Sequence, residues 1–283
     1  MGFRVELGKE VAQSEIVRYT RITFELGWVM GFADLHIHSM YSPDATTTVR
    51  AVLKQAADVG LDVIAITDHD AITGALEARE LASQYNVEVV TGAEVTTSEG
   101  HLVALYVETL PPAGMSLDET LLWIGHHGGI AIAPHPFNQL PNSLDLQSVI
   151  GVLNRPRAKG FLKGIEVYNM ATRAFNETAE KLSVYLPLAK TAASDAHVYW
   201  AIGVGRTQFR GSSADDLRAA RENASTIPIP FEGHMPAPPL LSWIRRIFLR
   251  RLGYISDAVS ASSPVNTQRF DRDALIKAMK IKK

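Results

Sequence analysis

Short apolar segments alternate with amphipathic ones along most of this chain. Apolar runs with the length and boundaries of buried strands occur at residues 32–38, 61–66, 87–91, 101–107, 130–133, 164–168 and 188–193. Apolar residues at helical spacing separate most of these runs, at residues 46–59, 73–83, 116–127, 144–153 and 172–185. Strands that alternate with helices predict an α/β fold of parallel β/α units, closed or nearly closed into a barrel.

Histidines and carboxylates recur where these expected strands end. Those at or just past a carboxyl end are His36, His38, His69, Glu94, His135, Asp195 and His197. His101 instead begins its expected strand, so we expect it on a loop or an antiparallel element. Barrels of this kind carry their chemistry at the carboxyl ends of the strands, and the repeated placement therefore predicts one shared site.

The first expected strand alternates in a way that brings two histidines together. In a strand, residues two apart project to the same face, so His36 and His38 lie side by side, with Leu35 and Ile37 facing the other way. Two such imidazoles bind a metal if further ligands join them. The pair alone is ambiguous, and the other strand-end residues favour a metal site.

Composition narrows the chemistry available to that site. The 283 residues are 46% apolar and 20% charged, and none is cysteine. Any bound metal must therefore use histidine and carboxylate groups. Because no apolar stretch reaches about 18 residues and residues 1–31 hold no signal-type run, we expect a cytoplasmic protein without a transmembrane segment.

Composition also divides the chain. We expect an N-terminal extension at residues 1–30, the α/β domain at 31–227, a Pro-rich linker at 228–239 and a basic helical C-terminal extension at 240–283. Residues 236–283 carry ten Lys and Arg against three Asp and Glu. A basic amphipathic helix in this extension either packs on the domain or a second subunit, or contacts an anionic membrane surface or nucleic acid.

Several short motifs resemble the PHP (polymerase and histidinol phosphatase) family over about residues 32–210. They are His36-Ile37-His38, Tyr41-Ser42-Pro43-Asp44, Ile66-Thr67-Asp68-His69, Gly92-Ala93-Glu94-Val95, Gly100-His101, Pro134-His135-Pro136 and Ser194-Asp195-Ala196-His197. The chain is most similar to the compact, free-standing members. This resemblance implies a distorted, TIM-like (β/α)7 barrel that binds two to three divalent metal ions and hydrolyses phosphoesters.

The resemblance also implies how the metal ligands are shared. One ion would take His36, His38, Glu94 and Asp195. A second would share Glu94 and add His101 and His135, and a third would take Asp44, His69 and His197. Histidine and carboxylate ligands suit Mn, Fe or Zn alike, so the sequence leaves the metal open.

Further residues are candidates for catalysis and substrate binding. The candidate catalytic residues are Glu94, which would bridge two ions, His197, and Asp68, which either orients an imidazole or caps the following helix. Arg173 and Arg206 are candidates for bidentate phosphate binding, and Asn169 for positioning the substrate.

These features predict a metal-dependent phosphoesterase that uses metal-activated water. The expected substrate is a phosphomonoester of a small metabolite or nucleotide, of the nucleoside monophosphate or 3′,5′-bisphosphate class. Alternatives are a 5′–3′ exonuclease on short oligonucleotides, a histidinol phosphatase and a non-catalytic metal-binding module. A metal-dependent hydrolase of C–N bonds is a further option, which the lack of an obvious barrel lysine for a bridging carbamate disfavours.

Overall fold

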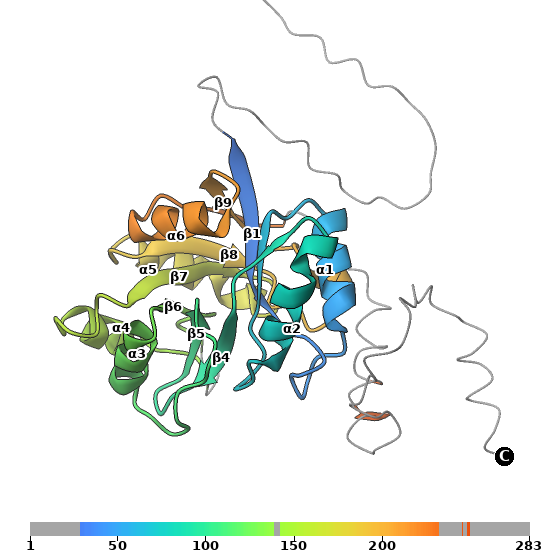
Figure 1. The fold of residues 1–283 in the computed structure, drawn as a ribbon. Coiled ribbons are helices and arrows are strands. Elements are labelled where there is room, and N and C mark those ends of the chain that lie inside the picture. The colour runs from blue at the N-terminus through green and yellow to red at the C-terminus, as the bar shows by residue number, and fades with distance from the viewer. Residues whose placement is uncertain (1–28, 139–141, 232–244, 246–247, 250–283) are drawn as a thin grey trace, which may run out of the picture.

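The computed structural model describes residues 29–138, 142–231, 245 and 248–249. Strands in this part form two five-stranded sheets, in the orders β10-β9-β1-β2-β3 and β4-β5-β6-β7-β8 (Figure 1). The first sheet contains β1 (Met30–Ile37), β2 (Val63–Ile66), β3 (Glu88–Val89), β9 (Arg206–Arg210) and β10 (Ile227–Ile229). The second contains β4 (Gly92–Thr96), β5 (His101–Leu105), β6 (Ile130–Ala133), β7 (Leu162–Asn169) and β8 (Ala189–Ala193).

The sheets are mixed rather than uniformly parallel. β1, β2 and β3 run parallel, as do β6, β7 and β8, whereas the pairs β1–β9, β9–β10, β4–β5 and β5–β6 are antiparallel. The sheets meet through isolated bridges, Ile37 with Ala196 and His69 with Glu94. The α/β class is confirmed, but the closed seven-unit barrel is not, because the described strands divide into two sheets.

Helices cover the strands on opposite sides. They are α1 (Val49–Asp58), α2 (Thr73–Leu81), α3 (Leu117–His126), α4 (Leu146–Leu153), α5 (Asn176–Ser183) and α6 (Ala214–Glu222). Short 3₁₀ helices occur at η1 (Ala82–Gln84), η2 (Arg173–Phe175) and η3 (Tyr199–Ala201). In Figure 1, α1 and α2 lie on one side of the strands, and α3 and α4 lie on the other.

Side-chain caps define where two of the expected helices begin. Thr48 precedes α1, and its hydroxyl accepts a hydrogen bond from the Ala51 N–H. Ser116 precedes α3 and forms a reciprocal capping box with Glu119. Each cap satisfies backbone N–H groups that the first turn of a helix leaves unbonded, so both starts agree with the expected ones.

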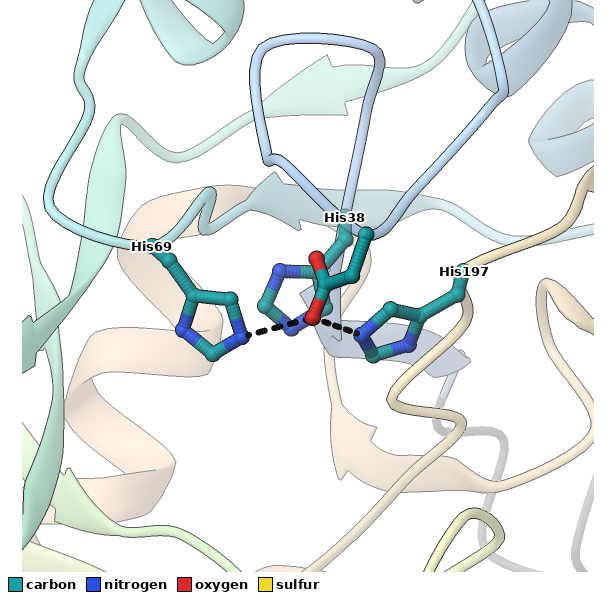
Figure 2. Close-up of side chains that lie close together, drawn as sticks. His38, His69 and His197 are labelled. Atoms are coloured by element: carbon teal, nitrogen blue, oxygen red, sulfur yellow. Dashed lines mark ion pairs between the residues drawn. The ribbon is translucent and has the colours of Figure 1, made fainter. Parts of the chain in front are cut away.

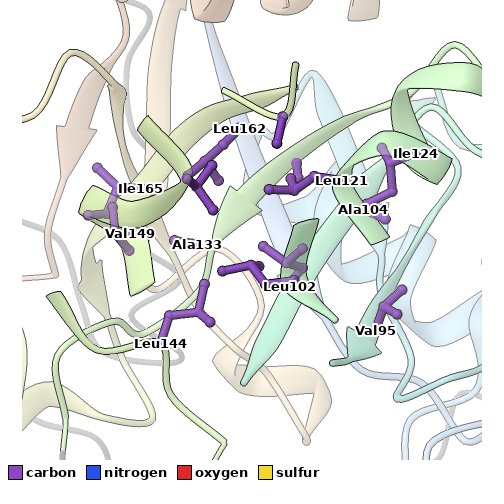
Figure 3. Close-up of a cluster of buried hydrophobic side chains, with 14 of the residues drawn as sticks. Val95, Leu102, Ala104, Leu121, Ile124, Ala133, Leu144, Val149, Leu162 and Ile165 are labelled. Atoms are coloured by element: carbon purple, nitrogen blue, oxygen red, sulfur yellow. The ribbon is translucent and has the colours of Figure 1, made fainter. Parts of the chain in front are cut away.

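Apolar faces of the helices pack on the strands and hold their carboxyl ends in place. Buried side chains of α3 and α4, including Leu121 and Val149, pack on Leu102 and Ile165 of the second sheet (Figure 3). Each fully buried aliphatic side chain of this kind contributes about 1.5–3 kcal/mol to folding. The site described below is therefore built on the ends of well-packed strands.

The first strand departs from the expected alternation. Leu35 and Ile37 are both buried, but they pack in different clusters. The pairing of β1 with β2 shifts register between Asp34 and Ile37. A shift of this kind re-aims side chains, so Leu35 and Ile37 do not share one face as a regular strand would require.

The C-terminal end of the domain contains elements that the periodicity did not predict. After His197 the chain forms β9, α6 and β10, and β10 pairs antiparallel with β9. β10 therefore extends past residue 227, the expected end of the domain, and places Pro228 in the sheet. Pro228 is tolerated there because β10 is an edge strand, where a missing N–H costs no ladder hydrogen bond.

Several predictions concern residues outside the described part of the chain. They include the N-terminal extension apart from its last two residues, most of the Pro-rich linker, and nearly all of the C-terminal extension, of which Arg245, Phe248 and Leu249 are helical. No helix among the described residues has the length and apolar character needed to cross a membrane.

Candidate metal centre

The nine residues predicted as metal ligands come from many elements and lie together. His36 lies in β1 and His38 directly after it, while Asp44 lies in the loop before α1. His69 follows β2, Glu94 lies in β4, and His101 begins β5, which is antiparallel to β4 as expected for this residue. The last three ligand candidates follow β6 and β8: His135, Asp195 and His197.

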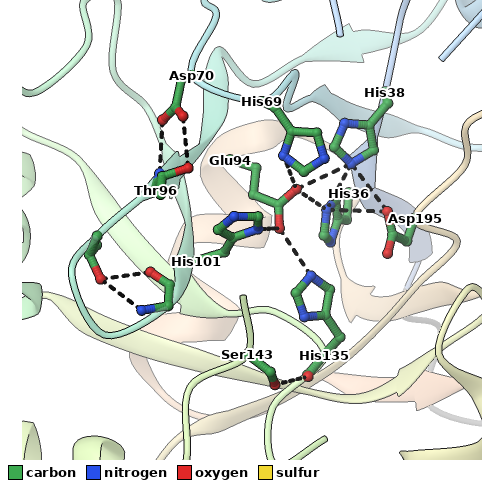
Figure 4. Close-up of polar contacts among 12 residues, drawn as sticks. His36, His38, His69, Asp70, Glu94, Thr96, His101, His135, Ser143 and Asp195 are labelled. Carbon is green, nitrogen blue, oxygen red and sulfur yellow. Dashed lines mark hydrogen bonds and ion pairs between the residues drawn. The ribbon is translucent and has the colours of Figure 1, made fainter. Parts of the chain in front are cut away.

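The Glu94 carboxylate lies at the centre of this group (Figure 4). It is buried, and both oxygens face imidazole nitrogens. Oε2 lies 3.2 Å from Nε2 of His36, 3.3 Å from Nε2 of His38 and 3.0 Å from Nδ1 of His69. Oε1 lies 2.8 Å from Nδ1 of His101 and 3.0 Å from Nε2 of His135. One side chain thus joins five histidines.

Two further carboxylates extend the cluster. Asp195 Oδ1 lies 3.1 Å from Nε2 of His38 and 3.6 Å from Nδ1 of His197. Asp44 Oδ2 lies 3.4 Å from Nε2 of His69 and 3.3 Å from Nε2 of His197. Figure 2 shows His38, His69 and His197 gathered around the carboxylate that makes the last two ion pairs.

Ligand atoms approach closely enough to share cations. Four groups have all their ligand atoms within 4.8 Å of one another: His36, His38 and Glu94; His36, His135 and Asp195; His69, Glu94 and His101; and His38, Asp44, His69 and His197. Because the groups overlap, they do not divide the nine residues into three ion sites. The division implied by the family resemblance stays a prediction.

Two details of the donor set fit a cation. Nε2 of His36 and Nε2 of His38 face one another at 3.1 Å, so a proton or a metal ion must separate their lone pairs. Nδ1 of His135 is buried and has no hydrogen-bond partner among the described residues. Nitrogen and carboxylate oxygen donors without sulfur suit Mn, Fe or Zn.

Strained backbone accompanies the ligands. His135 and Asp195 have φ angles of 29° and 51°, and Asp70, directly after His69, has 46°. Left-handed backbone at a residue other than glycine costs of the order of 1–3 kcal/mol and persists where surrounding contacts enforce it, often at functional sites. Hydrogen bonds supply that enforcement at His135, whose carbonyl accepts from Asn138 and Ser143.

Glu166 is a residue of the site that the sequence analysis missed. Its Oε1 lies 2.9 Å from Nδ1 of His36, and its Oε2 accepts hydrogen bonds from the His135 N–H at 2.8 Å and from Asn169 Nδ2 at 2.9 Å. The available signal was a carboxylate in the expected strand 164–168, whose other residues are Gly, Ile, Val and Tyr, and β7 is buried on both faces at this position. Such a residue is rarely buried without partners.

Asp68 does not cap the helix that follows it, which was one of its two predicted roles. Its oxygens accept from the Ser39 N–H at 2.6 Å and the Ser39 hydroxyl at 2.7 Å, and the N-cap of α2 is Ile72. The contact fixes the loop that carries Ser42, whose hydroxyl lies 3.0 Å from Nδ1 of His38. Asp68 therefore supports the loop beside His38, and its role in catalysis stays a prediction.

The three residues predicted to contact the substrate differ in what they contact in the structure. Arg206 is buried, and its Nε and Nη2 donate to the Gly203 carbonyl at 3.0 and 2.8 Å, so the guanidinium holds a turn instead of facing the cluster. Asn169 is also buried and donates to Asp195 Oδ2 at 3.2 Å, which makes it a support of the ligands. Arg173 begins η2 with an exposed side chain, and its role in phosphate binding stays a prediction.

Charges in the cluster shift the pKa values of its members in opposite directions. Burial alone would raise the pKa of Glu94, but the charge of His36 and hydrogen bonds from His101 and His135 hold it well below its usual value. Burial alone would lower the pKa of His36, but Asp195, Glu166 and Glu94 raise it well above its usual value. The metal-free cluster therefore favours anionic carboxylates and protonated imidazoles.

This arrangement predicts how pH changes stability when no metal is bound. The pKa values of His36, His38, His135 and His197 are raised in the folded protein. Their contribution to stability is complete below the unfolded value of about 6.5 and is lost as pH rises through their folded values. We expect the Tm of the protein in chelator to fall as pH rises above about 6.5, by about 2–4 °C for each kcal/mol lost.

Added metal should reverse that trend, because an imidazole must be neutral to bind an ion and binding therefore strengthens as pH rises. Thermal unfolding in chelator and in excess Mn²⁺ across this pH range measures both effects. A metal-free Tm that rises over the same range would contradict the assigned interactions.

Comparisons with known proteins agree with this site. The family model described as PHP domain matches residues 34–220. An uncharacterized protein of Methanocaldococcus jannaschii is 41% identical over 122 residues, which are 40% of this chain and 71% of that protein. Phosphoribosyl 1,2-cyclic phosphate 1,2-diphosphodiesterase of Eggerthella lenta is 41% identical over 86 residues, 28% of this chain and 32% of that enzyme.

A solved structure has a similar fold. It is a two-domain protein from Bacteroides vulgatus that contains a predicted PHP-like metal-dependent phosphoesterase. It aligns with a TM-score of 0.64 and 20% sequence identity, covering 83% of this chain and 74% of that one.

Proposed function

Because the chain belongs to the PHP domain family, we propose that the cluster around Glu94 holds two or three divalent metal ions and hydrolyses phosphoester bonds. One observation carries the proposal: a single buried carboxylate lies within 3.3 Å of nitrogen atoms from five histidines. Two further carboxylates, Asp44 and Asp195, complete a donor set of only nitrogen and oxygen.

The residues divide into holders of ions and supports. We assign the first ion to His36, His38, Glu94 and Asp195, the second to Glu94, His101 and His135, and the third to Asp44, His69 and His197. When bound, such ions neutralise charge on phosphoryl oxygens and lower the pKa of water from 15.7 to about 7. Glu94 would set the separation of the first two ions, and Arg173 would contact the phosphate through its planar guanidinium.

The proposed substrate is a small phosphomonoester or nucleotide, with nucleoside monophosphates and 3′,5′-bisphosphates as the favoured class. The name of the Eggerthella lenta relative describes a diphosphodiesterase acting on a cyclic phosphate. Cyclic phosphodiesters therefore belong in any substrate panel for this protein.

The test is turnover after reconstitution with Mn²⁺, Fe²⁺ or Zn²⁺, against phosphomonoesters, bisphosphates, cyclic phosphates and short oligonucleotides. We expect His38→Ala to lower kcat/KM on the best substrate by about 100-fold or more, since even the partners of metal ligands cost 10–100-fold when changed. His127→Ala is the matched control, because His127 is the C-cap of α3 and stacks on Trp123, outside the cluster.

The possible results of this test lead to different conclusions about the function. Full activity of His38→Ala would show that the cluster takes no part in the reaction. Preference for oligonucleotides, with a steep loss of activity as salt rises, would favour the exonuclease alternative over a small-molecule phosphatase.

A further inference from the structure

We propose that Glu166 is a positioning residue that fixes the imidazole tautomer of His36 and the backbone of His135 at the same time. The inference rests on the proposed metal-dependent function of the same cluster. Glu166 lies in β7 and is buried, with one carboxylate oxygen directed to each of the two ligands.

The first oxygen controls which nitrogen of His36 is free. Oε1 of Glu166 lies 2.9 Å from Nδ1 of His36. An ionised carboxylate only accepts hydrogen bonds, so Nδ1 must carry a proton. The other ring nitrogen, Nε2, is the one that faces Glu94 and His38. Glu166 thus keeps available the nitrogen that points into the cluster.

The second oxygen controls the backbone of the next ligand. Oε2 accepts from the His135 N–H at 2.8 Å. His135 has a φ of 29°, and its carbonyl accepts from Asn138 Nδ2 at 2.8 Å and from the Ser143 hydroxyl at 2.6 Å. Three side chains therefore hold the strained backbone of His135, and one of them, Glu166, also contacts a second ligand candidate, His36.

Asn169 extends the same support to a third ligand. Its Nδ2 donates to Glu166 Oε2 at 2.9 Å and to Asp195 Oδ2 at 3.2 Å. Asn169 is itself held, because its Oδ1 accepts from the Thr172 N–H at 3.0 Å. This hydrogen-bonded pair on β7 thereby joins one ligand candidate in β1 to two that follow β6 and β8. Displacing Glu166 would therefore disturb His36, His135 and Asp195 together.

Glutamine is a discriminating substitution at this position. In one orientation of the glutamine amide, its NH₂ group faces the Nδ1 proton of His36. In the other orientation it faces the His135 N–H and the Asn169 amide NH₂. Either way a donor meets another donor, and no hydrogen bond can form there. Aspartate keeps two acceptors but is one methylene shorter. We therefore expect metal affinity to decrease in the order wild type, Glu166→Asp, Glu166→Gln, with Glu166→Gln about 10–100-fold weaker.

The control is Thr191→Val. Thr191 pairs with Glu166 across β7 and β8, is buried, and donates its hydroxyl hydrogen bond to the Ile165 carbonyl. The variant removes one buried hydrogen bond at the same level of the sheet without a ligand contact. We expect it to bind Zn²⁺ as the wild type does, even if it lowers the Tm.

The experiment measures Zn²⁺ affinity by competition with a chelator and records ¹⁵N-labelled imidazole NMR spectra with and without Zn²⁺. We expect the wild-type His36 ring to keep a downfield Nδ1 proton in both states, and Glu166→Gln to lose or shift it. Unchanged affinity and an unchanged Nδ1 resonance in Glu166→Gln, or an equal affinity loss in Thr191→Val, would overturn the inference.

Failure of the proposed function would look different. A wild-type protein that binds no Zn²⁺ and hydrolyses no phosphoester contradicts that function. Even in that case, the Nδ1 resonance of metal-free His36 tests the inference about Glu166. A resonance that is the same in wild type and in Glu166→Gln would contradict it.

Discussion

Replacing Glu94 by glutamine is expected to lower phosphoester hydrolysis by about a thousandfold, or roughly 4 kcal/mol of transition-state stabilisation. The amide has nearly the same shape as the carboxylate but no negative charge, so it cannot bridge two cations. It would also leave five imidazoles around a neutral group. We therefore expect fewer bound ions as well as slower turnover, measured by elemental analysis and by steady-state kinetics on one preparation.

Glu177→Gln is the matched control for that prediction. Glu177 lies on α5 with an exposed side chain that pairs with Lys181. An exposed ion pair contributes little to stability and lies outside the cluster, so this variant should keep wild-type metal content and activity. If Glu94→Gln kept both as well, Glu94 would not be the bridging residue.

Removing the metal is expected to abolish activity and to lower thermal stability. A ligand that binds only the folded state at 100 times its Kd adds about 2.7 kcal/mol. For a domain of this size that corresponds to about 5–10 °C in Tm. Dialysis against chelator followed by titration with Mn²⁺ should first lose and then restore both activity and Tm.

The Glu94→Gln variant supplies the internal check on metal removal. Its Tm should respond little to Mn²⁺, because the residue that joins the ligands is gone. Activity that survives complete removal of metal from the wild type would contradict a metal-dependent mechanism. An equal Mn²⁺ response in the variant would place the stabilising ion away from Glu94.

Much of the site could be predicted because its signals are local. A histidine two residues after another in a strand, and further histidines and carboxylates at strand ends, are visible in the sequence before any fold is known. His101 was expected on a loop or an antiparallel element, and β5 is antiparallel to β4. Parallel strands bring their carboxyl ends to one edge, so residues far apart in the chain could be expected to meet.

The partners of buried polar groups could not be predicted in the same way. Arg206 follows a glycine-rich turn and was expected to bind phosphate, yet its guanidinium donates to the Gly203 carbonyl of that turn. Glu166 was read only as part of a strand, although it contacts two ligand candidates. Side-chain direction at such positions depends on tertiary packing, which periodicity does not encode.

Local sequence patterns also could not predict how the strands divide into two sheets. One strand was expected at residues 87–91, with Glu94 just past its end, whereas the chain forms β3 in one sheet and β4 in the other. The change of sheet places Glu94 within β4, opposite Val103 of β5, and so brings His101 beside it. Strand pairing over long separations decides this arrangement, and the sequence pattern predicts only that strands are present.

The most direct test of the central claim is a crystal structure of the protein grown with Mn²⁺, with anomalous diffraction used to locate the ions. We predict two or three anomalous peaks inside the cluster, each about 2–2.5 Å from its histidine and carboxylate ligands, with Glu94 between two of them. Fully occupied crystals whose ions all lie outside these nine residues, or a cluster without any ion, would contradict the account.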